Sequence, residues 1–242
     1  MRLRFNGLLL LFSFFTLASA AQTGVTTVGV QLKPIFPLSF LGTGKQTNDT
    51  ANVHFETELT SGFSGGLFIR HYFSNLVGLE GGINYIKRKY TLRIQDENTF
   101  SGTSYFRIIG YEIPVSAVFY VRVGEKLYAY GSLGPSLDMF ASDILTFDEY
   151  FKHISVRKSV FQPAINANIG FEYRTEKSGS FYLGASYHRP FTYIYGDKTE
   201  YKYNGKEVSV YNTLVGNYLT IDLRYFFHED PVQKKKKKKQ VE

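Results

Sequence analysis

The stretch that decides the fold runs from Ile109 to Val121 and reads IGYEIPVSAVFYV. Every odd position in it is apolar, and the even positions are mostly small or polar. Successive side chains of a β-strand point to opposite faces, so this alternation predicts a strand with one wholly apolar face. The apolar positions are Ile109, Tyr111, Ile113, Val115, Ala117, Phe119 and Val121.

Seven further segments alternate in the same way, and the connections between the segments alternate in length. The segments cover 28–33, 63–70, 77–85, 127–138, 165–174, 181–188 and 219–227. Short turns lie at 74–75, 124–126 and 176–179, and long polar connections lie at about 37–60, 90–107, 139–160 and 191–215. Short turns on one side and long loops on the other are typical of outer-membrane barrels. The pattern therefore predicts an all-β fold, an eight-stranded antiparallel up-and-down transmembrane β-barrel.

The composition excludes several classes of site and partner. The chain of 242 residues has no Cys, which excludes a disulfide scaffold, a Cys-ligated zinc site, a thiol nucleophile and a lipidated cysteine. The net charge of +7 comes mainly from Arg2, Arg4 and the run Lys234–Lys239. Between these ends basic and acidic residues nearly balance and form no basic stripe, so we expect no nucleic-acid partner.

The chain divides into three expected parts. Residues 1–20 read as a signal peptide, with Arg2 and Arg4 before the apolar run Leu8–Leu17 and an Ala18-Ser19-Ala20 cleavage site. Residues 21–227 are the expected barrel, and residues 228–242 are an expected disordered, Lys-rich periplasmic tail. No apolar stretch after Ala21 is long enough for a spanning helix, so an exported chain would cross the outer membrane as strands.

The polar strand face carries charges of both signs in mid-strand. A narrow barrel turns its apolar face to lipid, and opposite charges would pair in its interior. The alternative is the solvent face of a soluble sheet, against which the signal peptide and the loop rhythm argue. The expected lumen charge network is Arg70, Glu80, Arg88, Glu112, Asp138, Glu172, Arg174, Asp222 and Arg224.

Three segments carry a resemblance to known families. Tyr111–Val115 reads YEIPV, Gly131–Pro135 reads GSLGP, and Tyr218–Phe227 reads YLTIDLRYFF. They resemble the PorT-like and OmpA/OmpX-like outer-membrane β-barrel families of Gram-negative bacteria. The resemblance implies an eight-stranded barrel and no reaction, and it implies that Tyr225 and Phe227 belong to the signal read by the barrel-assembly machinery. The tail after Phe227 departs from many relatives, in which the last aromatic residue is at or near the C-terminus.

Five prolines fall in or beside the expected strands. Proline cannot donate to a ladder and is normally confined to edges and bulges, whereas a closed barrel has no edge. We expect bulges or lumen water at these places. The prolines are Pro34, Pro114, Pro135, Pro163 and Pro190.

The sequence holds no recognisable catalytic motif. His54 and His153 fall in long connections beside acids, and His188 falls on the lumen face, but solvated or hydrogen-bonded roles account for all three. No phosphate loop, metalloprotease motif or nucleophile elbow is present. We therefore expect no catalytic, cofactor-binding or metal-binding residue.

The expected function is a non-enzymatic structural or interaction role in the outer membrane. Envelope integrity, adhesion or service to a secretion machine would act through the four long loops, because loops on a rigid scaffold concentrate binding residues. The expected partners are outer-membrane lipid, the barrel-assembly machinery and an envelope or secretion protein. The loop aromatics suited to contact are Phe147, Tyr150, Phe151, Tyr195, Tyr201 and Tyr203.

Two other functions fit the same barrel. One is a membrane-embedded hydrolase or acyltransferase, which a lipid-facing or loop-borne cluster of Ser, His and acid would favour. The other is a narrow channel or small-ligand binder, which a continuous lumen would favour.

Overall fold

The computed structural model describes residues 25–37, 45–74, 76–96, 100–203 and 205–228. The predicted signal peptide (1–20) and all of the predicted tail (228–242) except its first residue lie outside the described residues. Within the described part, no helix is long and apolar enough to cross a membrane.

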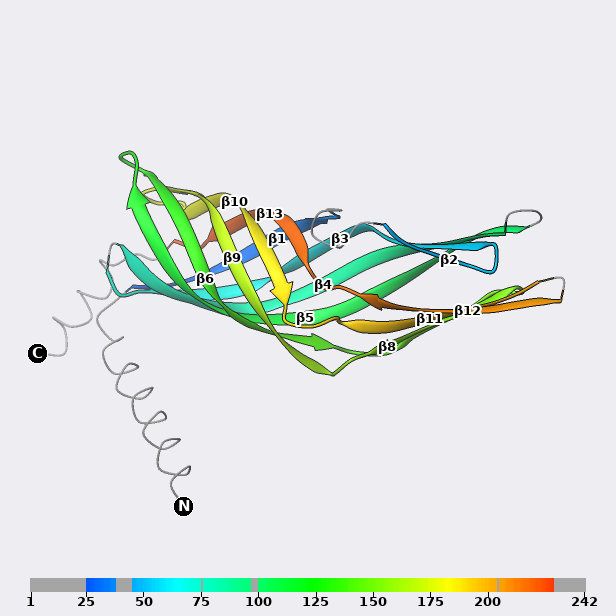
Figure 1. Ribbon diagram of the computed structural model, residues 1–242. Helices are drawn as coiled ribbons and strands as arrows, with labels where there is room; N and C mark the ends of the chain where they lie inside the picture. Colours follow the sequence, from blue (N-terminus) through cyan, green and yellow to red (C-terminus); the bar gives the residue numbers. More distant parts are fainter. Residues whose placement is uncertain (1–24, 38–44, 75, 97–99, 204, 229–242) are drawn as a thin grey trace, which may run out of the picture.

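Eight antiparallel strands of the described chain close into a ring, which confirms the predicted barrel (Figure 1). Around the ring their order is β1, β13, β10, β9, β6, β5, β4 and β3, and β3 pairs with β1 to complete it. Their bounds are β1 Thr26–Phe36, β3 Val53–Tyr72, β4 Val77–Asp96, β5 Phe100–Arg122, β6 Leu127–Phe140, β9 Phe161–Arg174, β10 Ser180–Pro190 and β13 Tyr218–Phe226.

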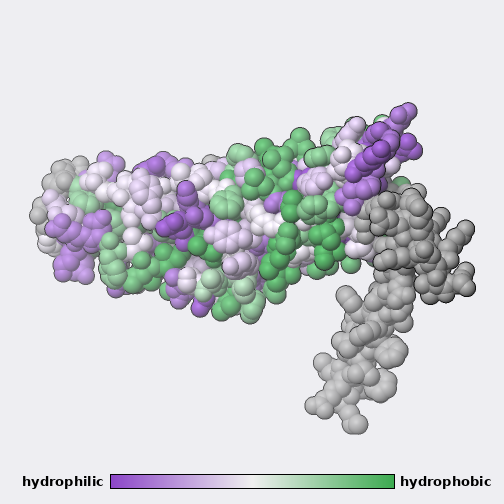
Figure 2. Space-filling view, turned by 180° about the vertical axis from the view of Figure 1, so that it is seen from behind, coloured by the Kyte–Doolittle hydropathy of each residue, from purple (hydrophilic) through white to green (hydrophobic). Residues whose placement is uncertain are grey.

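The two faces of each barrel strand differ as the alternation predicts. On β5, Ile113, Val115 and Phe119 are exposed on the outside, whereas Glu112 and Ser116 between them are buried inside. On the face that Figure 2 shows, apolar side chains gather over the barrel half of the molecule. A polar interior behind an apolar outer wall is the arrangement that a bilayer requires of a barrel.

The long connections contain far more strand than the prediction allowed. β3, β4 and β5 run on well beyond the ring, and β2 (Gln46–Thr50) pairs with the far end of β3. The segments 139–160 and 191–215 form a separate four-stranded sheet in the order β12, β11, β8, β7 (Figure 1). Its strands are β7 Ile144–Phe147, β8 Phe151–Arg157, β11 Tyr195–Tyr203 and β12 Lys206–Leu214. We call these strands, β2 and the far ends of β3–β5 the external extension.

The external extension has a hydrophobic core of its own. Phe55, Leu92 and Ile94 from the continued barrel strands pack in one cluster with Tyr201 and Val210 of the four-stranded sheet. Two sheets facing each other across buried alternate residues form a stable unit without any membrane. The expectation of polar loops is therefore wrong for most of these four segments.

No register shift of the described pairings falls at these prolines, so the bulge alternative is wrong, while lumen water at these places stays a prediction. Pro114 is opposite Ser136 in an unbroken register, and pairing with β4 lapses only between Gly81–Val115 and Asn84–Glu112. The register shift that the described pairings contain lies elsewhere, between Leu59 and Ser61 on β3. A barrel strand thus accommodates proline by omitting ladder pairs rather than by inserting a residue.

Candidate functional site

Six charged side chains in the lower lumen, toward the short turns, form a line in which the sign alternates. Arg174 Nε donates to Glu172 Oε1 at 2.6 Å, and Glu172 also binds Arg70. Arg70 Nε donates to Glu80 Oε2 at 2.9 Å. We call this line the charge chain, and its members in order are Arg174, Glu172, Arg70, Glu80, Arg224 and Asp222.

The second half of the charge chain is closed by Arg224. Its Nη1 donates to Glu80 Oε1 at 2.6 Å, and its Nη2 donates to Asp222 Oδ2 at 2.8 Å. Asp222 in turn accepts hydrogen bonds from Ser186 and Thr220. Each inner member therefore touches a charge of opposite sign on both sides, which is what buried charges require.

Aromatic rings fill the space around the arginines. The Arg70 guanidinium lies 3.5 Å from the centroid of Phe226 and 5.1 Å from that of Tyr130, and Arg224 lies 4.9 Å from Tyr182. Cations over ring faces gain further electrostatic stabilisation. The lower lumen is thus filled by ion pairs and rings that hold one another in place.

A second polar cluster lies in the upper lumen around His188, which the sequence placed on this face without naming its partners. His188 Nε2 lies 2.8 Å from Asp138 Oδ2, and Nδ1 lies 3.5 Å from Glu112 Oε1. The imidazole stacks on Tyr218 with ring centroids 4.6 Å apart. The Arg88 guanidinium also lies over the Tyr218 ring, 4.8 Å from its centroid. Arg88 forms no ion pair within the described residues.

The structure therefore places all nine predicted lumen residues on the inner face. Eight are buried, and Arg174 at the end of the charge chain keeps 27% of its side chain exposed. Asn84 and Asn166 were missed, and both donate to Glu112. Their signal was available, since both occupy even positions of strands already recognised by alternation.

A small cavity lies among these side chains. The cavity beside Lys33, Glu80 and Arg224 has a volume of about 30 Å³. A water molecule needs roughly 10–15 Å³ on this measure, so the cavity holds about two waters and no larger solute.

The predicted assembly residues lie on the outside at the short-turn end. Phe227 is exposed and Tyr225 half-buried, and their rings meet edge to face with centroids 5.3 Å apart. Phe226 between them points inward into the aromatic packing of the lumen. Recognition by an assembly machine remains a prediction.

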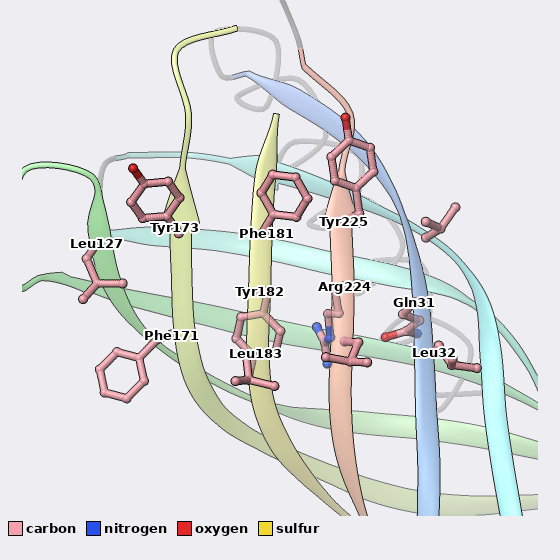
Figure 3. Close-up of a pocket in the computed structure, with 12 residues that line it drawn as sticks. Gln31, Leu32, Leu127, Phe171, Tyr173, Phe181, Tyr182, Leu183, Arg224 and Tyr225 are labelled. Atoms are coloured by element: carbon pink, nitrogen blue, oxygen red, sulfur yellow. The ribbon is translucent and has the colours of Figure 1, made fainter. Parts of the chain in front are cut away.

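A larger recess of about 610 Å³ lies in the outer wall near the same end (Figure 3). Its lining comes from five strands and is mostly outward apolar side chains, including Leu32, Leu127, Phe171, Phe181 and Leu183, with the buried Gln31, Tyr182 and Arg224 behind them. It opens on the apolar outer wall, so hydrocarbon chains are the occupants that its surface suits.

The external extension buries a Ser, a His and an acid together. His153 Nε2 contacts the carboxylate of Asp197 and also lies 3.1 Å from Ser155 Oγ, which donates to Asp197 Oδ1 at 3.1 Å. All three side chains are almost wholly buried. The expectation that His153 is a solvated neighbour of Asp148 and Glu149 is therefore wrong.

This cluster does not have the geometry of a catalytic triad. A triad base uses one ring nitrogen for the nucleophile and the other for the acid. Here both partners contact Nε2, and Nδ1 is buried without a partner in the described structure. The arrangement satisfies buried polar groups between sheets, and Ser155 is sealed from solvent. Nor do the described His, Asp and Glu residues include a group placed to hold a metal ion.

The outward face of the four-stranded sheet, in the aqueous half of the molecule, carries large apolar side chains among charged and polar ones. Leu145, Phe147, Val156 and Tyr211 are each more than half exposed there. We call these four residues the outer apolar face. Among the six loop aromatics expected to bind, Phe147 belongs to it, but Phe151, Tyr195 and Tyr201 are buried in the core of the external extension.

Comparison with known proteins adds a family and a fold. A family model described as "Outer membrane protein beta-barrel domain" matches residues 7–216. The structure of OprG from Pseudomonas aeruginosa aligns over 85% of this chain and 97% of its own, with 14% identity and a TM-score of 0.51, a likeness of fold alone. No curated protein matches the chain.

Two other solved barrels align more weakly. Ail, the attachment invasion locus protein of Yersinia pestis, is 12% identical over 84% of this chain and 99% of its own, with a TM-score of 0.35. The outer membrane protease OmpT from Escherichia coli is 11% identical over 84% and 95%, with a TM-score of 0.33.

Proposed function

The chain belongs to the outer membrane protein beta-barrel family, and we propose that it acts there as an interaction protein whose binding surface is the outer apolar face. The barrel anchors this surface in the outer membrane, and the external extension presents it to the aqueous side. The proposal assigns the chain no reaction. Its finer kinship, proposed from the YEIPV and GSLGP segments, is PorT-like.

The outer apolar face is the observation that carries the proposal. Exposed patches of large apolar side chains on a water-facing surface often mark interaction sites. Lys152 and Lys198 lie among these residues, 5.6 Å and 5.3 Å from the ring centroids of Phe147 and Tyr211. Exposed aromatic rings beside cations suit contact with another protein, so the proposed partner is an envelope or secretion protein.

Rigidity supports the same proposal. The core behind the sheet holds Tyr195 and Tyr201 fully buried, and the His153–Asp197 pair ties β8 to β11. A surface that is already ordered loses little conformational entropy on binding. The filled lumen and the sealed Ser155 disfavour the channel and hydrolase alternatives.

The proposal is tested with Leu145→Ser, Phe147→Ser and Tyr211→Ser combined in one variant. A matched control changes Ser101→Ala, Thr103→Ala and Tyr105→Ser on the exposed face of β5 in the same extension. A third variant deletes residues 231–242. Each is first checked for assembly by its heat-dependent gel migration and then scored for complementation of the null strain.

We expect only the first variant to assemble and fail to complement. In the wild type, a photo-crosslinker at position 147 should trap a partner. In the first variant, where residue 147 is changed, the crosslinker is placed at position 213 and should no longer capture that partner. If the first variant complements fully while the tail deletion does not, the working face is on the periplasmic side and the proposal is wrong.

A further inference from the structure

Three aromatic rings form a belt on the outside of the barrel. Phe63, Tyr85 and Tyr111 lie on the neighbouring strands β3, β4 and β5, and the ring centroids of Phe63–Tyr85 and of Tyr85–Tyr111 are each 5.9 Å apart. Tyr85 and Tyr111 are direct cross-strand partners. Outward aromatic rings at one height are typical of the boundary between lipid tails and headgroups.

The height of the belt agrees with the thickness of a membrane. The outward apolar positions of β5 run from Val121, beside the short turn, to Ile109, and Tyr111 of the belt lies ten positions from Val121. Ten residues of strand span about 33 Å, or about 25 Å across the bilayer at a tilt of roughly 40°. The apolar band of such barrels is also about 25 Å tall, so the belt marks its external edge.

The outward positions just beyond the belt carry a row of positive charges. Lys87 and Lys89 follow Tyr85 on β4, and Arg107 is the direct cross-strand partner of Lys89. We call Lys87, Lys89 and Arg107 the basic row. Like charges directly opposite each other destabilise a sheet, so the fold gains nothing from this placement.

No carboxylate neutralises the basic row within the described residues. The next outward cation on β4, Arg93, differs in this respect, because it contacts Glu56 and lies 3.3 Å from Glu58. Lys45 likewise lies 2.8 Å from Glu56. Three unpaired positive charges thus lie together at the height of the external headgroups, whereas Arg93 and Lys45 farther out are matched by Glu56.

We propose that the basic row binds the phosphate of a phosphorylated lipid in the external leaflet. Lys89 and Arg107 are about 5 Å apart at Cβ and Lys87 is about 7 Å farther along the strand, so three cations can surround one phosphorylated headgroup. Arginine binds phosphate bidentately, and long basic side chains reach from an apolar wall to the headgroup layer. The belt and the apolar wall directly below hold the acyl chains, which a soluble anion lacks.

The test compares two probes, lipid A with its phosphates and lipid A from which they have been removed. Protein in uncharged detergent is titrated with each probe, and bound lipid is counted by native mass spectrometry. The test variant combines Lys87→Gln, Lys89→Gln and Arg107→Gln. The control combines Lys126→Gln, Lys177→Gln and Lys202→Gln, which removes the same charge from other surfaces.

The wild type should bind the phosphorylated probe at least tenfold more tightly than the dephosphorylated one. The test variant should lose that preference, and the control should keep it. Equal binding of the two probes by the wild type would overturn the proposal, and so would a preference that survives in the test variant. Free inorganic phosphate that competes at equal concentration would show that the row recognises a soluble anion, which also overturns it.

Discussion

Glu112 and Ile113 are adjacent in the chain and lie in two different environments, the polar lumen and the outer wall. Glu112 is 1% exposed among Asn84, Asn166 and Tyr218, and Ile113 is 41% exposed on the outer wall. The carboxylate tolerates the interior because Asn84, Asn166 and Tyr218 donate hydrogen bonds to it. The identity of each barrel residue is therefore set by which side of a single backbone it occupies.

Ile113→Arg should weaken the barrel, because it places a charge against lipid. A charge against lipid costs about 2–4 kcal/mol at the bilayer midplane and about 0–1 kcal/mol near the interface, so Ile113, two positions inside the external edge, should lose an intermediate amount. Urea unfolding of the variant in lipid vesicles measures it. Tyr105→Arg on the same strand is the control, since Tyr105 is 74% exposed in the external extension and should tolerate the charge. Equal stability of the two variants would mean that the assigned lipid face is wrong.

Arg70→Leu should cost more stability than Arg174→Leu. Arg70 is fully buried and contacts two carboxylates, Glu172 and Glu80, and the substitution leaves each of them with one cation instead of two. Breaking a buried pair costs about 3–5 kcal/mol. Arg174 is partly solvated, so water screens its ion pair with Glu172 and losing that pair costs less. The same unfolding assay ranks the variants, and Glu172→Leu added to Arg70→Leu should restore part of the loss. A reversed ranking would contradict the charge chain.

The strands of the ring differ in how far they extend beyond the barrel. β1 and β13 end near its rim, while β4 and β5 continue to form one sheet of the external extension. The register shift between Leu59 and Ser61 lies where β3 leaves the ring, and a bulge of this kind bends and twists a strand. Farther down, Gly134 on β6 allows β5 to approach closely, because a Cβ there would lie 2.0 Å from the carbonyl oxygen of Val115.

Acid should loosen the corner of the external extension formed by β2, β3 and β4. Burial raises the pKa of Glu56, but hydrogen bonds and charge from Lys45 and Arg93 outweigh it and hold the pKa below its ordinary value of 4.5. The unfolded chain then takes up the proton more readily than the folded one. The ion pairs of Glu56 stabilise the corner fully when the pH is above the ordinary pKa of 4.5. This stabilisation is lost as the pH falls through the lower pKa of Glu56 in the folded protein.

Hydrogen exchange over residues 46–57, corrected for the intrinsic effect of pH, measures this loosening. Protection should fall below about pH 4.5 in the wild type. Glu56→Gln should remove that pH dependence while leaving the barrel strands unchanged. A corner equally protected at pH 3 and pH 7 would show that the Glu56 ion pairs contribute nothing to its stability.

At the scale of the whole molecule, a filled barrel in the outer membrane carries a two-sheet body outside it (Figure 1). One core of apolar residues lies between the sheets of the external extension and reaches into the upper barrel at Ile35, Ile86 and Tyr218, and the other consists of aromatic rings around the charge chain. The two parts therefore differ in what orders them. The membrane supports one of them, and the hydrophobic effect in water supports the other.

The purified protein should show no stepwise conductance in planar bilayers. The charge chain and its rings occupy the lumen, and the cavity beside them holds about two waters. Insertion is confirmed independently, since a closed barrel runs at different gel positions before and after boiling. Reproducible conductance steps from correctly inserted protein would mean that the side chains of the lumen move apart, and would revive the channel hypothesis.

The sequence by itself determined the ring of eight strands and the direction of each side chain in it. Alternation is a local property, because neighbouring residues of a strand must face opposite solvents, and Ile109–Val121 shows it without knowledge of any partner. The inward position of Glu112, Glu172, Asp222 and Arg224 follows from the same rule. Tyr90, Leu92 and Ile94 continue the alternation, so the extension of β4 was also readable.

Only the tertiary structure decided that the segments 139–160 and 191–215 form a sheet with a core. In β11 both faces are largely polar, since Asp197 and Thr199 point inward while Lys198 and Glu200 point outward, so the period of two is hidden. Asp197 is tolerated inside because His153 and Ser155 meet it from β8, more than forty positions away. Such compensation depends on which strands become neighbours, and the local pattern of a single segment does not contain that information.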